Sequence, residues 1–179
     1  MLGNIRPATA SELCGMRGTV GTAWVPDDVL KRMIAEAERT LPFETGGVLL
    51  GYWAASDQVV LTDSIGPGPR ALHRKGSFVP DPSYHENGIA RVYAESGCRY
   101  TYLGDWHTHP KSIPRMSRLD RGTLRRISTY SPARAPVALM AILGGRSDWE
   151  LHIWRYANRA GMLRLCRTAP LSVRIFARL

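Results

Sequence analysis

The chain is poor in cysteine, and its three cysteines are isolated from one another. Cys14, Cys98 and Cys166 are odd in number, lie far apart and form no Cys-x-x-Cys pair. A disulfide framework needs an even set of cysteines, and a thiolate zinc site needs paired ones. The sequence therefore predicts neither, and it favours a reducing, cytoplasmic setting.

Long apolar runs, repeats and low-complexity segments are also missing from the 179 residues. No apolar stretch approaches the ~20 residues that cross a bilayer. The first 22 residues are interrupted by Ser11, Glu12 and Arg17, so they lack the apolar segment of a secretion signal. We expect no membrane partner. The length and the 44% of hydrophobic residues are typical of one globular domain. We predict a single domain over 25–179, preceded by an N-terminal extension over 1–24.

Acidic residues are the minority among the charges. The chain has 15 Asp and Glu against 24 Lys and Arg, a net charge of +9, and the excess is concentrated in residues 115–126 and 155–178. Such a surface attracts anions, which makes nucleic acid or an acidic protein a candidate partner. Aromatic residues are not interleaved with the arginines, as a single-strand binding groove would require. We therefore favour a solvated basic surface over a nucleic-acid site.

The spacing of apolar residues outlines a mixture of helices and strands. It predicts helices over 27–40, 82–96 and 117–130. It predicts strands over 46–53, 59–65, 100–106, 136–143, 149–156 and 161–168, with a loop over 66–77. These elements do not alternate in a regular strand–helix–strand repeat. We therefore expect an α+β (mixed α/β) fold, in which helices flank a mixed sheet.

The chemistry is concentrated around Gly104 to Pro110, where a predicted strand runs out into a proline-rich segment. His107 and His109 are two residues apart, so a strand would point both imidazoles to one side. Ser117 and Asp120 are three residues apart at a predicted helix start, which places both side chains on one helix face. His107, His109 and Asp120 can then offer two nitrogens and one oxygen to a single ion.

Three protein ligands and one open position are typical of a catalytic zinc site, whereas closed structural sites use four ligands. Zinc lowers the pKa of bound water to about 7, and a general base still helps to move protons to a leaving amine. Glu44, just ahead of the strand predicted over 46–53, is the candidate base. Asp105 is interpreted as structural, because strand alternation leaves it out of the ligand set. Ser117 can equally be a helix cap.

These positions resemble the motif of the JAB/MPN (JAMM) metalloprotease family. That motif consists of an upstream Glu, His-Ser/Thr-His, seven residues, Ser, two residues and Asp. Glu44, His107-Thr108-His109, Ser117 and Asp120 reproduce it in residue type and spacing. The flanking residues Glu44-Thr45-Gly46-Gly47 and Gly104-Asp105-Trp106 are similar to those of prokaryotic members. The resemblance spans about residues 25–157, and five positions with two fixed spacings make it specific.

The resemblance implies an MPN/JAB (cytidine-deaminase-like) fold, a twisted mixed sheet flanked by helices. It implies one zinc ion per chain, held by His107, His109 and Asp120. It further implies that Glu44 acts as general base and later acid, and that Ser117 hydrogen-bonds the oxyanion of the tetrahedral intermediate. The implied activity is that of an isopeptidase or peptidase that cleaves after the C-terminus of a ubiquitin-like protein. Segment 66–80 resembles the insertion that covers the substrate tail.

The resemblance also implies partners, namely a ubiquitin-like protein or its conjugates, together with enzymes of the conjugation system. Prokaryotic members occur in antiviral defence operons, and others trim sulfur-carrier proteins; the sequence leaves both settings open. The alternative function is that of an MPN scaffold or a basic nucleic-acid-binding module in which hydrolysis is absent or secondary. Scaffolding members typically lack the ligand set that this chain retains.

Overall fold

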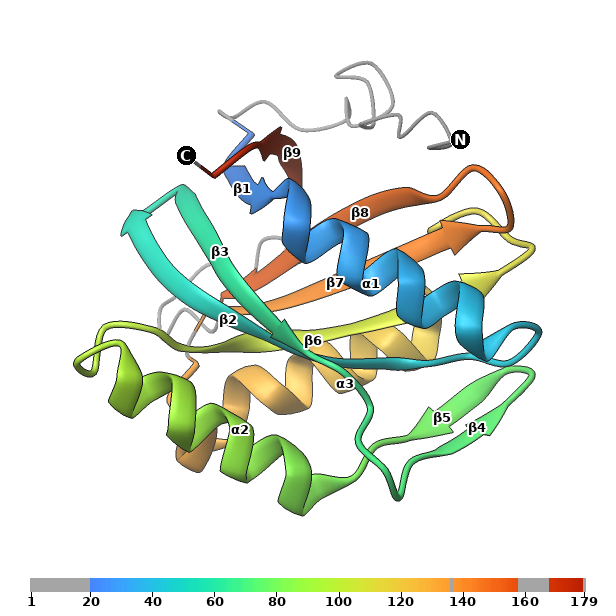
Figure 1. Cartoon of the computed structure of the whole chain (residues 1–179). Helices are drawn as coiled ribbons and strands as arrows, with labels where there is room; N and C mark the ends of the chain where they lie inside the picture. Colours follow the sequence, from blue (N-terminus) through green and yellow to red (C-terminus); the bar gives the residue numbers. More distant parts are fainter. Residues whose placement is uncertain (1–19, 136, 158–167, 179) are drawn as a thin grey trace.

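Seven strands form one curved sheet, and helices lie on both of its faces (Figure 1). The computed structural model describes residues 20–135, 137–157 and 168–178. The predicted helices are confirmed as α1 (Asp27–Thr40), α2 (Pro82–Glu95) and α3 (Arg118–Thr129), and a short 3-10 helix η1 (Ser131–Ala133) follows α3. Within the described residues, no helix combines the length and apolar character needed to cross a membrane.

The sheet is mixed, as the sequence predicts. Its strands are β1 (Thr22–Pro26), β2 (Gly46–Ala55), β3 (Gln58–Ile65), β6 (Thr101–Pro110), β7 (Val137–Gly145), β8 (Glu150–Ala157) and β9 (Thr168–Phe176). Their order is β1-β3-β2-β6-β7-β8-β9. Strand β1 pairs in parallel with both β3 and β9, so the order closes on itself, and β6 and β7 are also parallel. The remaining neighbours are antiparallel.

Two of the predictions for single elements need correction. The loop predicted over 66–77 contains β4 (Leu72–Arg74) and begins the next strand, β5 (Ser77–Val79), which pairs with β4 as a separate hairpin. Strand β6 does not end at residue 106 but continues to residue 110, because its last residues pair in parallel with β7. Strands β1 and β9 were not predicted. The strand predicted over 161–168 lies outside the described residues, except for its last position.

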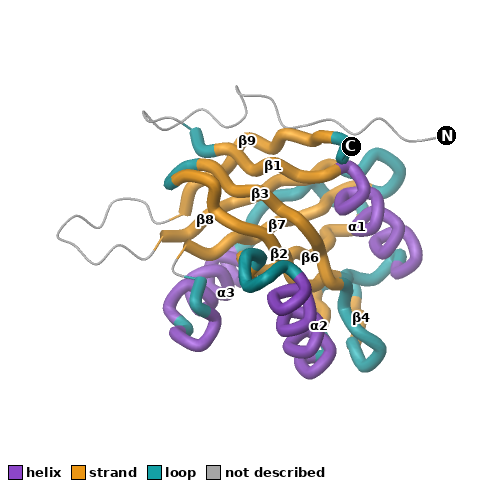
Figure 2. The backbone as a smooth tube through the Cα atoms, turned by 60° about the vertical axis from the view of Figure 1, so that its left-hand side comes forward, coloured by secondary structure: helices purple, strands orange, loops and turns teal. Residues whose placement is uncertain are grey.

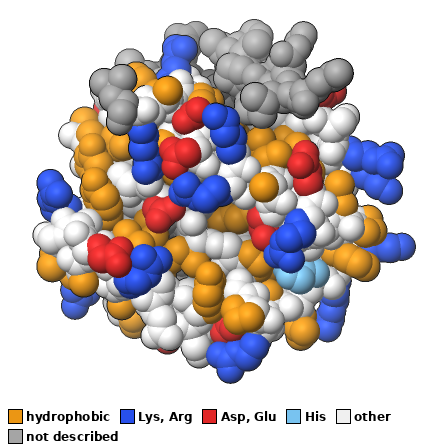
Figure 3. All heavy atoms as spheres, viewed as in Figure 1, with side chains coloured by type: hydrophobic (Ala, Val, Ile, Leu, Met, Phe, Trp, Pro, Cys, Tyr) orange, Lys and Arg blue, Asp and Glu red, His pale blue; other side chains and the backbone are white. Residues whose placement is uncertain are grey.

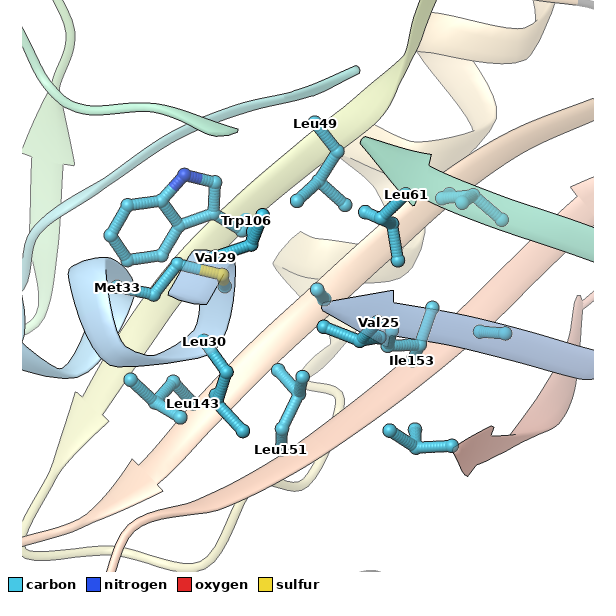
Figure 4. Close-up of a cluster of buried hydrophobic side chains, with 14 of the residues drawn as sticks. Val25, Val29, Leu30, Met33, Leu49, Leu61, Trp106, Leu143, Leu151 and Ile153 are labelled. Carbon is cyan, nitrogen blue, oxygen red and sulfur yellow. The ribbon is translucent and has the colours of Figure 1, made fainter. Parts of the chain in front are cut away.

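The main core lies on the concave side of the sheet, where α1 packs (Figure 4). Val29, Leu30 and Met33 from α1 are at most 2% exposed and pack with side chains from all seven strands of the sheet. The acidic first turn and basic last turn of α1 match the helix dipole. Helices α2 and α3 lie next to each other on the opposite face (Figure 2). This second face carries the candidate site.

A bulge at Gly104 decides which side chains of β6 reach each face. The register of β2 with β6 shifts at this point, and Gly104 has φ of 150°. A Cβ atom here would lie 2.0 Å from the carbonyl oxygen of Leu139, so only glycine fits. As a result, Leu103 and Trp106 both enter the core under α1. The alternation that follows carries His107 to the face of α2 and α3.

Two buried threonines join β6 to the segment that leads into β2. Thr45 and Thr108 are both 0% exposed. The Thr45 amide donates to Thr108 Oγ1 over 2.9 Å, and the Thr108 amide donates to the Thr45 carbonyl over 2.8 Å. The Thr108 hydroxyl also donates to that carbonyl over 3.3 Å. Thr45 adjoins Glu44, so these bonds hold Glu44 beside the histidine strand.

Replacing Thr108 by Val should destabilise the protein, because Val keeps the shape of Thr but leaves the buried Thr45 amide without an acceptor. We expect a loss of about 1–3 kcal/mol in the free energy of unfolding. Urea denaturation measures this loss, and hydrogen exchange should show faster exchange of the Thr45 amide. Thr108→Ser keeps the hydroxyl and should leave that amide protected. Equal protection of Thr45 in the Val and Ser variants would contradict the role of the hydroxyl.

Candidate metal centre

The two histidines of β6 point their ring nitrogens at one another on the face of α2 and α3. The Nε2 atoms of His107 and His109 are 3.0 Å apart, and their ring centroids are 4.9 Å apart. Both residues lie within the strand rather than beyond its end, so the period-two argument applies to them directly. Both line a cavity of about 510 Å³.

Asp120 is brought to the histidines by the start of α3. Ser117 is the N-cap of this helix: its Oγ accepts from the Asp120 amide over 3.1 Å, and its own amide donates to Asp120 Oδ2 over 2.6 Å. This capping box turns the carboxylate of Asp120 toward β6. Asp120 Oδ1 lies 3.3 Å from His107 Nε2, and Asp120 Oδ2 lies 3.8 Å from His109 Nε2.

The electrostatics of this cluster favour the protonation states that bind metal. Burial alone would raise the pKa of Asp120, but the hydrogen bonds from His107 and Ser117 outweigh it and hold that pKa below its usual range. Burial, together with the nearby His107, lowers the pKa of His109. An ionised carboxylate and a neutral imidazole are the forms that ligate a metal ion. The three ligand atoms lie within 4.8 Å of one another, which is compatible with a single bound ion.

Glu44 lines the same cavity and is held there through its backbone. Its amide donates to the carbonyl of Arg74 over 2.8 Å, and the His73 ring nitrogen Nδ1 lies 2.9 Å from its carbonyl oxygen. The hairpin of β4 and β5 therefore fixes Glu44 from one side, and Thr45 fixes it from the other. Burial raises the pKa of the Glu44 carboxyl; Asp120 adds to this effect and His107 opposes it. The carboxyl is thus predisposed to accept a proton.

Other residues of the cavity were not singled out by the sequence. Asp105 lies on the same side of β6 as His107, so the alternation argument that left it out was wrong. Its Oδ1 accepts from the Tyr102 hydroxyl over 2.7 Å, and burial raises its pKa. His85 of α2 also lines the cavity, with Nε2 2.8 Å from the Gly66 carbonyl oxygen. No motif spacing marks His85, so the sequence offered no signal for it.

Comparison with known proteins identifies relatives over most of the chain. Residues 26–159 match the family of prokaryotic homologues of the JAB domain. A probable metalloprotease of Sinorhizobium fredii is 40% identical over 133 residues, which cover 73% of this chain and 81% of the relative. A CD-NTase/cGAS isopeptidase of Vibrio cholerae is 27% identical over 106 residues, covering 59% of this chain and 65% of the relative. Its counterpart in Pseudomonas aeruginosa is 31% identical over 107 residues, covering 58% and 64%.

Solved structures agree on the fold. The solution structure of a protein from Desulfitobacterium hafniense superposes with a TM-score of 0.64 at 16% identity, covering 88% of this chain and 95% of that one. At this identity the likeness supports the fold and nothing beyond it. The family match and the names of the relatives support a metal-dependent peptidase or isopeptidase. The chain belongs to the JAB/MPN metalloprotease family, in its prokaryotic branch.

Proposed function

We propose that the protein is a zinc-dependent isopeptidase or peptidase that cleaves after the C-terminus of a ubiquitin-like protein. The observation that carries the proposal is the convergence of His107, His109 and Asp120 on one cavity that Glu44 also lines. Two nitrogens and one carboxylate oxygen leave one position open for a reacting group, as a catalytic zinc site requires.

The spacing of the ligand atoms fits zinc. In a tetrahedral site with zinc–nitrogen distances of about 2.0–2.1 Å, neighbouring ligand atoms are roughly 3.3 Å apart. Here the two Nε2 atoms are 3.0 Å apart, and the Asp120 carboxylate approaches His107 Nε2 to 3.3 Å through Oδ1 and His109 Nε2 to 3.8 Å through Oδ2. The ligands come from a strand and from a capped helix end, both of which are rigid elements. His107, His109 and Asp120 would therefore hold the ion with little rearrangement.

Zinc would supply Lewis-acid chemistry, making water available as hydroxide near neutral pH and polarising the scissile carbonyl. Glu44 would accept the proton of the attacking water and return it to the leaving amine. A base is most useful when its pKa lies close to the working pH, and the raised pKa of Glu44 moves it in that direction. Its backbone contacts fix the main chain of residue 44 at the cavity wall, which its side chain lines.

Ser117 would hydrogen-bond the oxyanion of the tetrahedral intermediate. Its Oγ already accepts from the Asp120 amide, so this serine is the helix cap. A hydroxyl that accepts one bond still has a hydrogen to donate. This hydrogen can point at the Asp120 carboxylate, where it helps to lower the pKa of Asp120, and it would turn toward the oxyanion, because Ser117 lines the cavity. Capping and oxyanion binding are therefore compatible in one residue.

The position of the hairpin of β4 and β5 supports the proposal that the substrate is an extended peptide segment. Ser77 and Phe78 of β5 line the cavity, and among the described residues β5 pairs with β4 alone, so its other edge is unpaired. An extended C-terminal tail can add to such an edge through main-chain hydrogen bonds. A ubiquitin-like protein presents a tail of this kind. The isopeptidase names of the Vibrio and Pseudomonas relatives favour deconjugation over precursor trimming, in keeping with a conjugation system in an antiviral defence operon.

The purified protein should contain about one zinc ion per chain, because the three ligands close only one site. Metal analysis should show that His109→Ala and Asp120→Ala lose this zinc. Asp120→Asn should lose it too while keeping an oxygen for the Ser117 amide, which separates ligation from capping. His152→Ala is the matched control, since His152 pairs with Glu150 and stands apart from the cluster. Full zinc occupancy in the Asp120→Asn protein would show that another residue completes the site.

Glu44→Gln should abolish most of the cleavage but keep the zinc, because Gln preserves size and hydrogen bonding but cannot take a proton. Loss of a positioned base costs on the order of 10²–10⁴ in rate. The assay compares zinc content, melting temperature and cleavage of a bacterial ubiquitin-like protein fused to a fluorescent reporter. Glu38→Gln, at an exposed position of α1, is the control for the same chemical change.

The two halves of this proposal fail separately. Near-native turnover by the Glu44→Gln protein would refute the assignment of the base. If the zinc-loaded native protein cleaves no ubiquitin-like fusion or conjugate, the substrate class is wrong, although the zinc site stands.

A further inference from the structure

The outer face of α3 carries a stripe of arginines. Arg118, Arg121 and Arg125 are three and four residues apart, so they align along one side of the helix, and all three are exposed. Arg115 is exposed just before the helix begins. We call these four residues the arginine face. Asp120, the one acidic residue of α3, turns instead toward the histidines.

The cations of the other helices are neutralised locally, but those of the arginine face are not. Ion pairs within α1 and α2 join Lys31 to Asp27, Arg32 to Asp28, Arg39 to Glu36 and Arg91 to Glu95. Acidic and basic side chains are interspersed on the molecular face shown in Figure 3. Across the described ranges, no carboxylate pairs with the arginine face. Like charges at this spacing repel and destabilise the folded protein, and no ion pair within the described residues offsets this repulsion.

The arginine face adjoins the cavity through exposed aliphatic side chains. Leu119, Thr123 and Arg126 form the neighbouring side of α3 and line the cavity of the candidate metal centre. Leu119 is 66% exposed, and Ile113, between the second histidine and the helix, is 58% exposed. Large aliphatic residues next to unpaired arginines are typical of a protein-binding surface with a charged rim. Through Leu119, Thr123 and Arg126 this surface is continuous with the place where a substrate would react.

We infer that the arginine face, with Ile113 and Leu119, docks an acidic and partly apolar protein surface on the substrate that presents the scissile bond. The inference rests on the proposed function, because it places this partner at the mouth of the cavity. Charge complementarity with the arginines requires a negatively charged partner, and the two aliphatic residues require apolar groups on the same partner. Nucleic acid fits less well, because its phosphates would pair with the arginines and leave Ile113 and Leu119 in contact with charge.

The test measures binding by fluorescence anisotropy near physiological ionic strength and needs no hydrolysis. The probes are a labelled peptide with leucines scattered among glutamates, a matched peptide with serine in place of leucine, and duplex DNA. The native protein should bind the Glu/Leu peptide most tightly. The triple variant Arg118→Glu/Arg121→Glu/Arg125→Glu should weaken this binding at least about tenfold, because each reversal turns an attraction into a repulsion. Leu119→Ser should reduce the difference in affinity between the leucine-containing peptide and the serine-containing peptide.

The control reverses three exposed arginines elsewhere and carries the same change in net charge: Arg99→Glu/Arg134→Glu/Arg174→Glu. It should bind the Glu/Leu peptide as the native protein does, and both triple variants should keep native melting temperatures and metal content. An equal loss in the control would overturn the inference in favour of general charge. Tighter binding of duplex DNA, or no binding of the Glu/Leu peptide, would also overturn it. If the native protein fails to cleave the ubiquitin-like fusion, that result would instead concern the proposed function alone.

Discussion

The arrangement of the candidate site depends on the interlock of two buried threonines. Thr45 follows Glu44, and Thr108 lies between the two histidines, so the three hydrogen bonds that join them also join the candidate base to the candidate ligands. Both threonines are fully buried, and the bonds cannot be exchanged for water without local unfolding. Groups that must cooperate at the cavity are therefore positioned from inside the core.

Much of the site could be predicted because its parts obey local periodicities. His107 and His109 share a face for any strand, and Ser117 and Asp120 share a face for any helix start. The structure then brings the histidines and Asp120 together in one cluster. Helix α1 was predicted with the observed bounds because its acidic first turn and the spacing of its apolar residues are local signals as well. Such signals need no knowledge of the partners of an element.

The features that were missed depend on partners distant in sequence. Strand β1 has few residues and is stabilised by β3 and β9, which lie far along the chain. The extension of β6 to Pro110 follows from parallel pairing with β7, and proline at the end of a strand gave the opposite indication. No window of local sequence contains these neighbours. Asp105 is a different case, because local alternation already places it on the same face as His107, and its exclusion was an error in applying that rule.

The capping box at Ser117 gives one carboxylate two duties. Asp120 accepts the Ser117 amide at Oδ2 over 2.6 Å, and the same carboxylate offers a ligand atom to the centre. Binding of an ion would therefore be thermodynamically linked to the order of the first turn of α3, and each would favour the other by the same free energy. A protein that settles on α3 and steadies its first turn would tighten the hold on the ion. Binding of a partner at α3 and binding of the ion at the centre would then be coupled through the same ordering of the first turn.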